Sequence, residues 1–160
     1  MKILRYLVLL AMFASGAKAQ DFDKGVAAYN AGDYQTALKE LLPLAEGGDA
    51  TSQYNVGTIY YIGVGVVQNY VETFKWYKLA ACQGLVGAQL SIAAMYEAGE
   101  GVTQSNVIAH MWYNIVSANG FKDASKWRAE IAAKMTQEDI AKAQAMAQEC
   151  ISSGYKNCGD

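Results

Sequence analysis

The chain has 160 residues, of which 52% are hydrophobic and 18% are charged, and its formal net charge is −2. This length suits one domain, and the few, scattered lysines and arginines exclude the basic face that a nucleic-acid-binding protein normally presents. A single proline and frequent alanines favour helices along the whole chain.

Residues 1–19 have the pattern of a secretory signal peptide. Lys2 and Arg5 precede a short apolar stretch, and Ala17-Lys18-Ala19 forms a small-residue cleavage site. The stretch is shorter than the roughly 20 residues that a membrane-spanning helix needs, which argues against an anchor. Cleavage after Ala19 would leave ten basic and fifteen acidic residues, a formal charge of −5. We therefore expect a periplasmic or secreted protein with no membrane span after cleavage.

The segment 22–48 is predicted to form two helices joined by a turn at Gly32-Asp33. Shifting the sequence by 36 residues places its alanines and leucines under the apolar and small residues of the second helix of the next segment, from Thr73 to Ala81, so a helix is predicted over 34–47. Pro43 lies late in this helix, where it removes one backbone hydrogen bond and is expected to kink the last turn. The segment is interpreted as a degenerate copy of the units that follow it.

A repeat of 36 residues organises the middle of the chain. Laid on itself with this shift, the segment 50–85 matches 86–121 at ten identical positions, among them Trp76-Tyr77 with Trp112-Tyr113. Similarity at a fixed period of this length is the signature of stacked repeat proteins. Because these aromatic residues recur with the period, we assign them to packing between helices.

Each 36-residue unit is predicted to be a helical hairpin. In the first unit, apolar and small residues at helical spacing indicate a helix over 50–62. Gly63 and Gly65 then allow a tight reversal, and Asn69 can cap a second helix that Gly84 ends. Because one hairpin cannot bury its apolar face alone, neighbouring units must stack.

The end of the chain is predicted to hold a partial repeat and a capping helix. A helix is expected from 123 to 134, and Thr136 with Asp139 resembles a capping box that starts a last helix running to about Ile151. Cys150 and Cys158 are close enough to join the tail to this helix in an oxidising compartment, so a disulfide is predicted between them. Cys82 is then left over and is interpreted as a small, partly buried helix residue.

These motifs resemble those of Sel1-like repeats, which are relatives of the tetratricopeptide repeat. The resemblance rests on Ser52-Gln53-Tyr54-Asn55-Val56-Gly57-Thr58-Ile59-Tyr60, Gly63-Val64-Gly65-Val66, Trp76-Tyr77 and Ala80-Ala81-Cys82-Gln83-Gly84, and on their counterparts in the next unit. The second unit departs from the family pattern at Ala93, where glycine is usual, and at Val116-Ser117, where two alanines are usual.

The resemblance implies an all-α fold, a right-handed α-solenoid of stacked antiparallel helix pairs with a C-terminal capping helix. The solenoid would span residues 20–153, and its parts would be a degenerate repeat over 22–48, full repeats over 50–85 and 86–121, and a partial repeat with the cap over 123–153. Residues 154–160 would form a C-terminal tail.

The resemblance also implies that the first helices of the repeats line a concave groove that binds a protein or peptide. By position, the residues that face this groove are Tyr29, Asn30, Thr51, Tyr54, Thr58, Tyr61, Ala94 and Glu97, with Phe22, Val26 and Leu90 beside them. Tyr54 and Leu90 could equally belong to the core. The predicted function is a non-catalytic scaffold in the cell envelope, with an obligate structural or inhibitory subunit as a further possibility.

Few residues in the chain offer catalytic chemistry. His110 is the only histidine, and its repeat position predicts partial exposure; Glu97 and Glu100 lie near a turn and are expected to be solvated. No cluster has metal-ligand spacing, and no cofactor is implied. Some cysteine-rich members of the family are associated with β-lactam binding and hydrolysis. Ser153-Gly154-Tyr155-Lys156 therefore keeps a β-lactam or cell-wall hydrolase open as the alternative, although no partner motif accompanies it.

Overall fold

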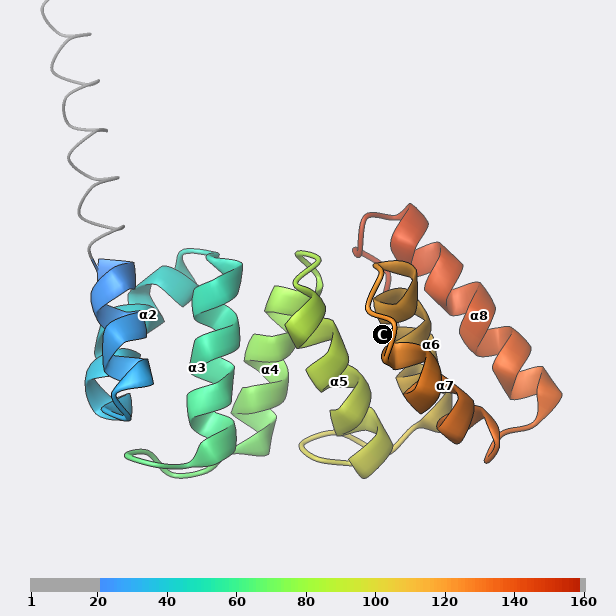
Figure 1. Ribbon diagram of the computed structural model, residues 1–160, viewed down its shortest axis with the longest axis horizontal. Helices are drawn as coiled ribbons and strands as arrows, with labels where there is room; N and C mark the ends of the chain where they lie inside the picture. The colour runs from blue at the N-terminus through green and yellow to red at the C-terminus, as the bar shows by residue number, and fades with distance from the viewer. Residues whose placement is uncertain (1–20, 159–160) are drawn as a thin grey trace, which may run out of the picture.

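The computed structural model describes residues 21–158, and all regular secondary structure in this range is helical (Figure 1). Residues 21–30 are helical. The helices that follow are α2 (Tyr34–Glu46), α3 (Ala50–Ile62), α4 (Tyr70–Ala81), α5 (Val86–Ala98), α6 (Asn106–Ala118), α7 (Ala124–Ala132) and α8 (Gln137–Ser152). The predicted signal peptide and its cleavage site lie outside the described residues.

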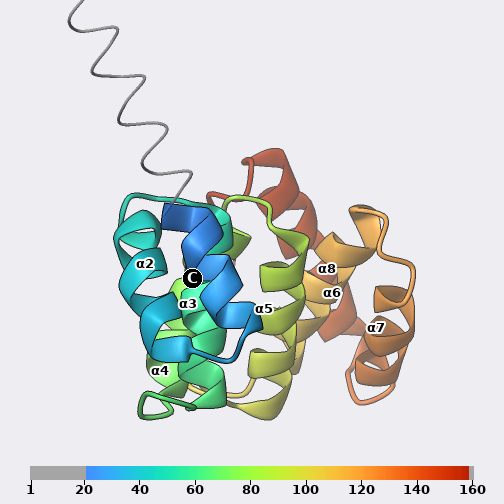
Figure 2. The ribbon, with the colours of Figure 1, turned by 60° about the vertical axis from the view of Figure 1, so that its left-hand side comes forward.

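From α2 to α7, helices that are neighbours in sequence are also neighbours in space, and the helices form a row from α2 at one end to α8 at the other (Figure 1). Figure 2 shows the same row from another side. The order changes at the last step, because α8 packs mainly on α6 and not on α7, which precedes it in the sequence. The predicted solenoid of stacked helices is therefore confirmed. Among the helices of residues 21–158, none is both long and apolar enough to cross a bilayer.

The hairpin turns follow the local sequence signals. Gly63 and Gly65 have φ of +72° and +78°, the left-handed region in which glycine is not strained. Asn69 caps α4 as predicted, because its side-chain oxygen accepts hydrogen bonds from the backbone N–H groups of Val71 and Glu72. Each reversal is therefore specified within the repeat that contains it.

The start of α8 differs from the predicted capping box in one contact. The Thr136 hydroxyl oxygen accepts from the Asp139 backbone N–H at 3.1 Å, as a cap should. The Asp139 carboxylate, however, accepts from the Thr136 hydroxyl at 2.9 Å rather than from a backbone N–H. The preceding helix is also shorter than predicted, because α7 ends at Ala132 and a turn follows it.

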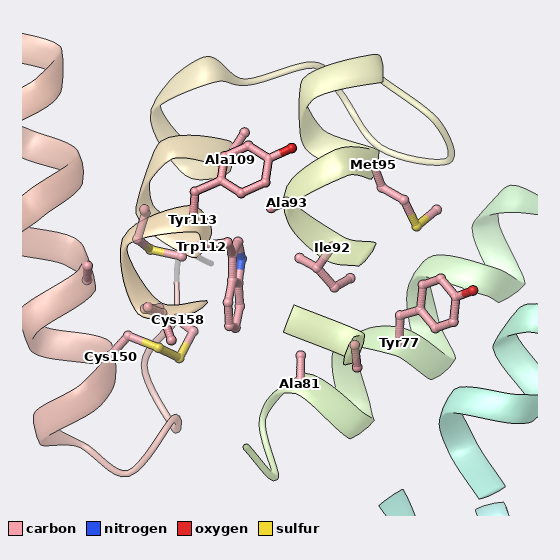
Figure 3. Close-up of a cluster of buried hydrophobic side chains, with 14 of the residues drawn as sticks. Tyr77, Ala81, Ile92, Ala93, Met95, Ala109, Trp112, Tyr113, Cys150 and Cys158 are labelled. Atoms are coloured by element: carbon pink, nitrogen blue, oxygen red, sulfur yellow. A yellow bond between two sulfur atoms is a disulfide. The ribbon is translucent and has the colours of Figure 1, made fainter. Parts of the chain in front are cut away.

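The core consists of two apolar clusters along the row. The smaller one packs α2 against α3 and includes Trp76; the larger one includes Trp112, which is 1% exposed. Figure 3 shows the Trp112 indole on the side of α6 that faces α5. The recurring Trp residues therefore pack between helices, as their period predicted.

The predicted disulfide between Cys150 and Cys158 is confirmed. Both side chains are buried, with a Cα–Cα distance of 4.6 Å, and the bond lies between α8 and α6 in Figure 3. It holds the tail after α8 against the larger cluster, and in that position the Tyr155 hydroxyl donates to Asn119. Cys82 is half-buried on α4, in agreement with its interpretation as a packing residue.

Buried amide groups connect each repeat to the one before it. The Gln53 side chain on α3 donates to the Ala45 carbonyl of α2 and accepts from Gln83, in the turn after α4. The same pair of bonds recurs 36 residues later, and its members are Gln89, Ala81 and Asn119. Because an unpaired buried amide or carbonyl is unfavourable, these bonds fix the register of one helical pair on the next.

Candidate functional site

Tyrosine side chains from three helices gather on one surface of the solenoid. Tyr54, Thr58 and Tyr61 are spaced three and four residues apart on α3, so they share one side of that helix. Tyr29, from the helical segment 21–30, and Tyr77, from α4, lie next to them. We call the surface formed by Tyr29, Tyr54, Thr58, Tyr61 and Tyr77 the tyrosine face.

Direct contacts join the members of the tyrosine face. The rings of Tyr54 and Tyr77 stack with centroids 5.1 Å apart. The hydroxyl oxygens of Thr58 and Tyr77 are 3.0 Å apart. Because the Thr58 hydroxyl donates to the Tyr54 carbonyl, it accepts from Tyr77 in this contact. The rings are therefore held in fixed positions.

Three tyrosines of this face have a raised pKa. Burial raises the pKa of Tyr29, Tyr61 and Tyr77, and it outweighs the hydrogen bond between Tyr77 and Thr58, which acts to lower the pKa of Tyr77. The nearby Glu100 carboxylate raises the pKa of Tyr61 further. The surface thus offers neutral hydroxyl groups that can donate and accept, next to aromatic rings.

A cavity of about 210 Å³ opens at the edge of the tyrosine face. Its walls come from three helices and from the turn after α5: they are Tyr61, Tyr77, Ser91, Ala94, Met95 and Glu100. Figure 3 shows Met95 reaching from α5 toward Tyr77 of α4. Tyr61 is 39% exposed and so remains accessible to a partner.

The corresponding place in the next repeat is filled by the chain itself. Glu97 stands 36 residues after Tyr61, and its carboxylate accepts from the Tyr113 hydroxyl at 2.9 Å. Lys134 reaches the same carboxylate at 3.6 Å. Trp127 occupies the position of Ser91 and packs against Tyr113 with ring centroids 6.1 Å apart. The space beside Tyr113 is therefore occupied by side chains of the chain itself.

Only some of the residues predicted for the groove lie at or beside the cavity. Tyr61 and Ala94 line the cavity, and Tyr29, Tyr54 and Thr58 lie beside it on the tyrosine face. Asn30 and Thr51 are exposed, and neither belongs to the residues that line the cavity.

Glu97 is not simply solvated, as its turn position had suggested. It is half-buried because Tyr113 and Lys134 both hold its carboxylate.

Four cavity residues were not predicted as site residues, namely Tyr77, Ser91, Met95 and Glu100. Tyr77 was assigned to packing because it recurs with the repeat, yet its hydroxyl lies on the tyrosine face. Ser91 and Met95 lie on the same helix as Ala94, so their helical spacing was the signal that could have found them. Glu100 follows α5 in the turn, so helical spacing could not assign it to the same surface.

His110 contradicts its predicted partial exposure, since it is 2% exposed. The reason is that α6 is covered by α5, α7 and α8 together, so more than one side of this helix is buried. Its Nδ1 accepts from the Asn114 amide at 3.0 Å, and Arg128 holds the oxygen of the same amide. Burial lowers the His110 pKa, and the Arg128 charge lowers it further.

This histidine should make the fold less stable in mild acid. Below the ordinary histidine pKa of 6.5 the unfolded chain takes up a proton at His110, while the folded chain resists it because its pKa is lowered. The melting temperature should therefore fall as pH drops through about 6.5 toward 5. In His110→Gln the fall should be smaller, as measured by circular dichroism melts at several pH values. An equal fall in both proteins would show that other groups cause it.

The other chemical candidates have structural partners. The Ser153 hydroxyl donates to the Cys150 carbonyl and accepts from the Asn157 backbone N–H, so it shapes the turn after α8. Within residues 21–158, no group of three or more His, Cys, Asp or Glu side chains is arranged to hold a metal ion.

Comparison with known proteins gives a family and two related structures. The model of the Sel1 repeat family matches residues 50–85 and 86–121. A Sel1 repeat protein from Oxalobacter formigenes is similar, with 29% identity and a TM-score of 0.65 over 79% of this chain and 98% of that one. No curated protein matches.

The second structure is a protective antigen present in uropathogenic Escherichia coli strains, described as displaying an SLR fold. It has a TM-score of 0.81 and 23% identity over 89% of this chain. The chain spans 32% of that antigen's length, and the likeness concerns the fold.

Proposed function

We propose, from the premise that this chain is a Sel1 repeat protein, that it is a scaffold that binds a peptide segment of another protein on its tyrosine face. Sel1 repeats form a protein-interaction fold in general, and stacked helical pairs of this kind present an extended surface.

The observation that carries the proposal is the fixed arrangement of the partly exposed Tyr29, Tyr54 and Tyr61 around the buried Tyr77, beside a side-chain-sized cavity. Tyrosine is enriched among the residues that dominate binding energy at interfaces. Here the stacked Tyr54 and Tyr77 rings and the Thr58 hydrogen bond already hold the surface in place. A partner would therefore lose little affinity to ordering these side chains, because little freedom remains to them.

We place the protein in the periplasm or outside the cell. Two features support this: the signal-peptide pattern of residues 1–19 and the disulfide between Cys150 and Cys158. Disulfides persist in oxidising compartments and are rare in the cytosol. Mass spectrometry of the protein recovered from a periplasmic extract or culture medium tests this, and a mature chain that begins before residue 20 would contradict the cleavage site.

The binding function can be tested by selection from a displayed library of random dodecapeptides. We expect the wild-type protein to enrich a set of peptides, and Tyr61→Ala to bind synthetic copies of them about tenfold more weakly, the effect of about 1.4 kcal/mol. Leu79→Ala is the matched control, because Leu79 is 45% exposed and lines a separate hollow with Lys75 and Lys78. Its affinity should equal that of the wild type.

Two results would count against the proposal. Selection that enriches no peptide, or enriched peptides that lose affinity equally with Leu79→Ala and Tyr61→Ala, would remove the tyrosine face as the binding surface. Turnover of a chromogenic β-lactam that disappears in Ser153→Ala would instead favour the hydrolase alternative.

A further inference from the structure

We infer that the cavity beside the tyrosine face receives a basic side chain, lysine or arginine, of the bound peptide. This rests on the proposed function and specifies the chemistry of its partner. The cavity is the one lined by Tyr61, Tyr77, Ser91, Ala94, Met95 and Glu100.

The size of the cavity fits a side chain rather than a small-molecule ligand. Sites for drug-sized ligands are typically about 300–1,000 Å³, and this one is about 210 Å³. It lies at the edge of the tyrosine face, where Tyr61 is exposed and Tyr54 is half-buried. The backbone of the bound peptide would pass over these two side chains. A single long side chain would fill it.

The walls of the cavity have the chemistry that a basic side chain needs. The Tyr61 and Tyr77 rings and the Met95 side chain can cover an aliphatic stem, and an aromatic ring attracts a nearby cation. Of the described residues that line the cavity, Glu100 alone carries a charge, and that charge is negative. It lies near Tyr61, the exposed residue of the lining, whose pKa it helps to raise. An acidic side chain would be repelled here.

In the next repeat, a lysine of the chain itself already binds a carboxylate beside the corresponding tyrosine. There Lys134 places its ammonium group 3.6 Å from the Glu97 carboxylate, which also binds the Tyr113 hydroxyl. One repeat earlier, Tyr77 stands in the place of Tyr113, but Ala98 stands where Lys134 would be. The carboxylate is supplied by Glu100 instead. The repeat therefore keeps the tyrosine and an acid but provides no lysine of its own at that position.

The dodecapeptide selection tests this through the composition of the enriched peptides. We expect lysine or arginine at one fixed position in most of them. Replacing that residue by norleucine in a synthetic peptide, which keeps the stem and removes the charge, should weaken binding about tenfold. The difference between the two peptides should shrink as salt concentration rises.

The variant Glu100→Gln should lose the preference for the charged peptide and bind it and the norleucine peptide with similar affinity. Glu138→Gln, an exposed carboxylate on α8, is the control and should keep the preference. Circular dichroism melts establish whether both variants fold. If Glu100→Gln does not fold, the comparison of the charged and norleucine peptides on the wild-type protein still tests the inference.

The outcomes separate the two proposals. Enriched peptides without a fixed basic residue, or a preference that persists in Glu100→Gln, would overturn the basic-side-chain inference while leaving peptide binding intact. A selection that enriches nothing overturns the proposed function and this inference with it.

Discussion

Replacing Trp112 by alanine should lower the free energy of unfolding by about 3–5 kcal/mol, the usual range for truncating a buried tryptophan. The indole is 1% exposed and belongs to the larger core cluster, between α6 and α5. Its nitrogen has no hydrogen-bond partner among the described residues, so its contribution comes from packing. Because the free energy of unfolding of a whole domain is typically only about 5–15 kcal/mol, this variant should be unfolded to a large extent or should unfold at a much lower urea concentration.

Trp127→Ala is the control for this prediction. Trp127 is half-buried on α7 and stacks on Phe121 with centroids 6.1 Å apart, outside the tightly packed centre. We expect it to lower the free energy of unfolding by about 1–2 kcal/mol, within the range of an ordinary substitution. Urea denaturation followed by circular dichroism measures both values. Equal losses for the two variants would mean that the interface between α5 and α6 does not depend on Trp112.

The substitution Gly101→Ala should destabilise the protein by about 3 kcal/mol or more, which is exceptional for the addition of one methyl group. Gly101 has φ of +70°, where an L-residue is strained by roughly 1–2 kcal/mol. In addition, a Cβ atom would lie 2.2 Å from the carbonyl oxygen of Tyr70, at the start of α4. Both groups belong to the backbone, so the turn after α5 would have to move away from α4.

Gly65→Ala separates these two causes. Gly65 occupies the same position one repeat earlier and has φ of +78°, but a Cβ atom there would be no nearer than 3.3 Å to the Gln35 side chain. It should therefore show the backbone strain without the backbone clash and melt closer to the wild type than Gly101→Ala does. Thermal melts of the two variants are sufficient. If they melt at the same temperature, the close approach of Gly101 to the Tyr70 carbonyl does not affect the stability of the fold.

The agreement between sequence and structure is best where a signal is local. Asn69, Thr136 and the Gly63–Gly65 turn act within a few residues of themselves, so their roles could be predicted without knowledge of the packing. The aromatic pairs could be assigned to the core because they recur every 36 residues. The nearness of Cys150 to Cys158 in sequence likewise restricted their pairing.

The candidate site was predicted less completely, because its members come from different repeats. Tyr61 and Ala94 could be assigned to one surface from their repeat positions, but Glu100 enters the cavity from the turn that follows α5. His110 was misjudged for a related reason. Its repeat position predicted exposure, but α8 packs on α6 at the end of the row and covers sides that an inner repeat would leave open.

The sequence by itself determined the helical repeat, its turns and caps, and the residues available for the core, since each of these depends on spacing along the chain. Only the tertiary structure decided which repeat keeps an open cavity. Two neighbouring repeats carry the same tyrosine, Tyr77 and Tyr113. Trp127 packs beside Tyr113 and Lys134 reaches the carboxylate that Tyr113 binds, whereas Tyr77 contributes to the wall of the cavity together with Tyr61. The physical reason is that a cavity depends on the volume and charge of side chains from three or more helices at once. Which side chains come together at one place is decided by how the helices stack.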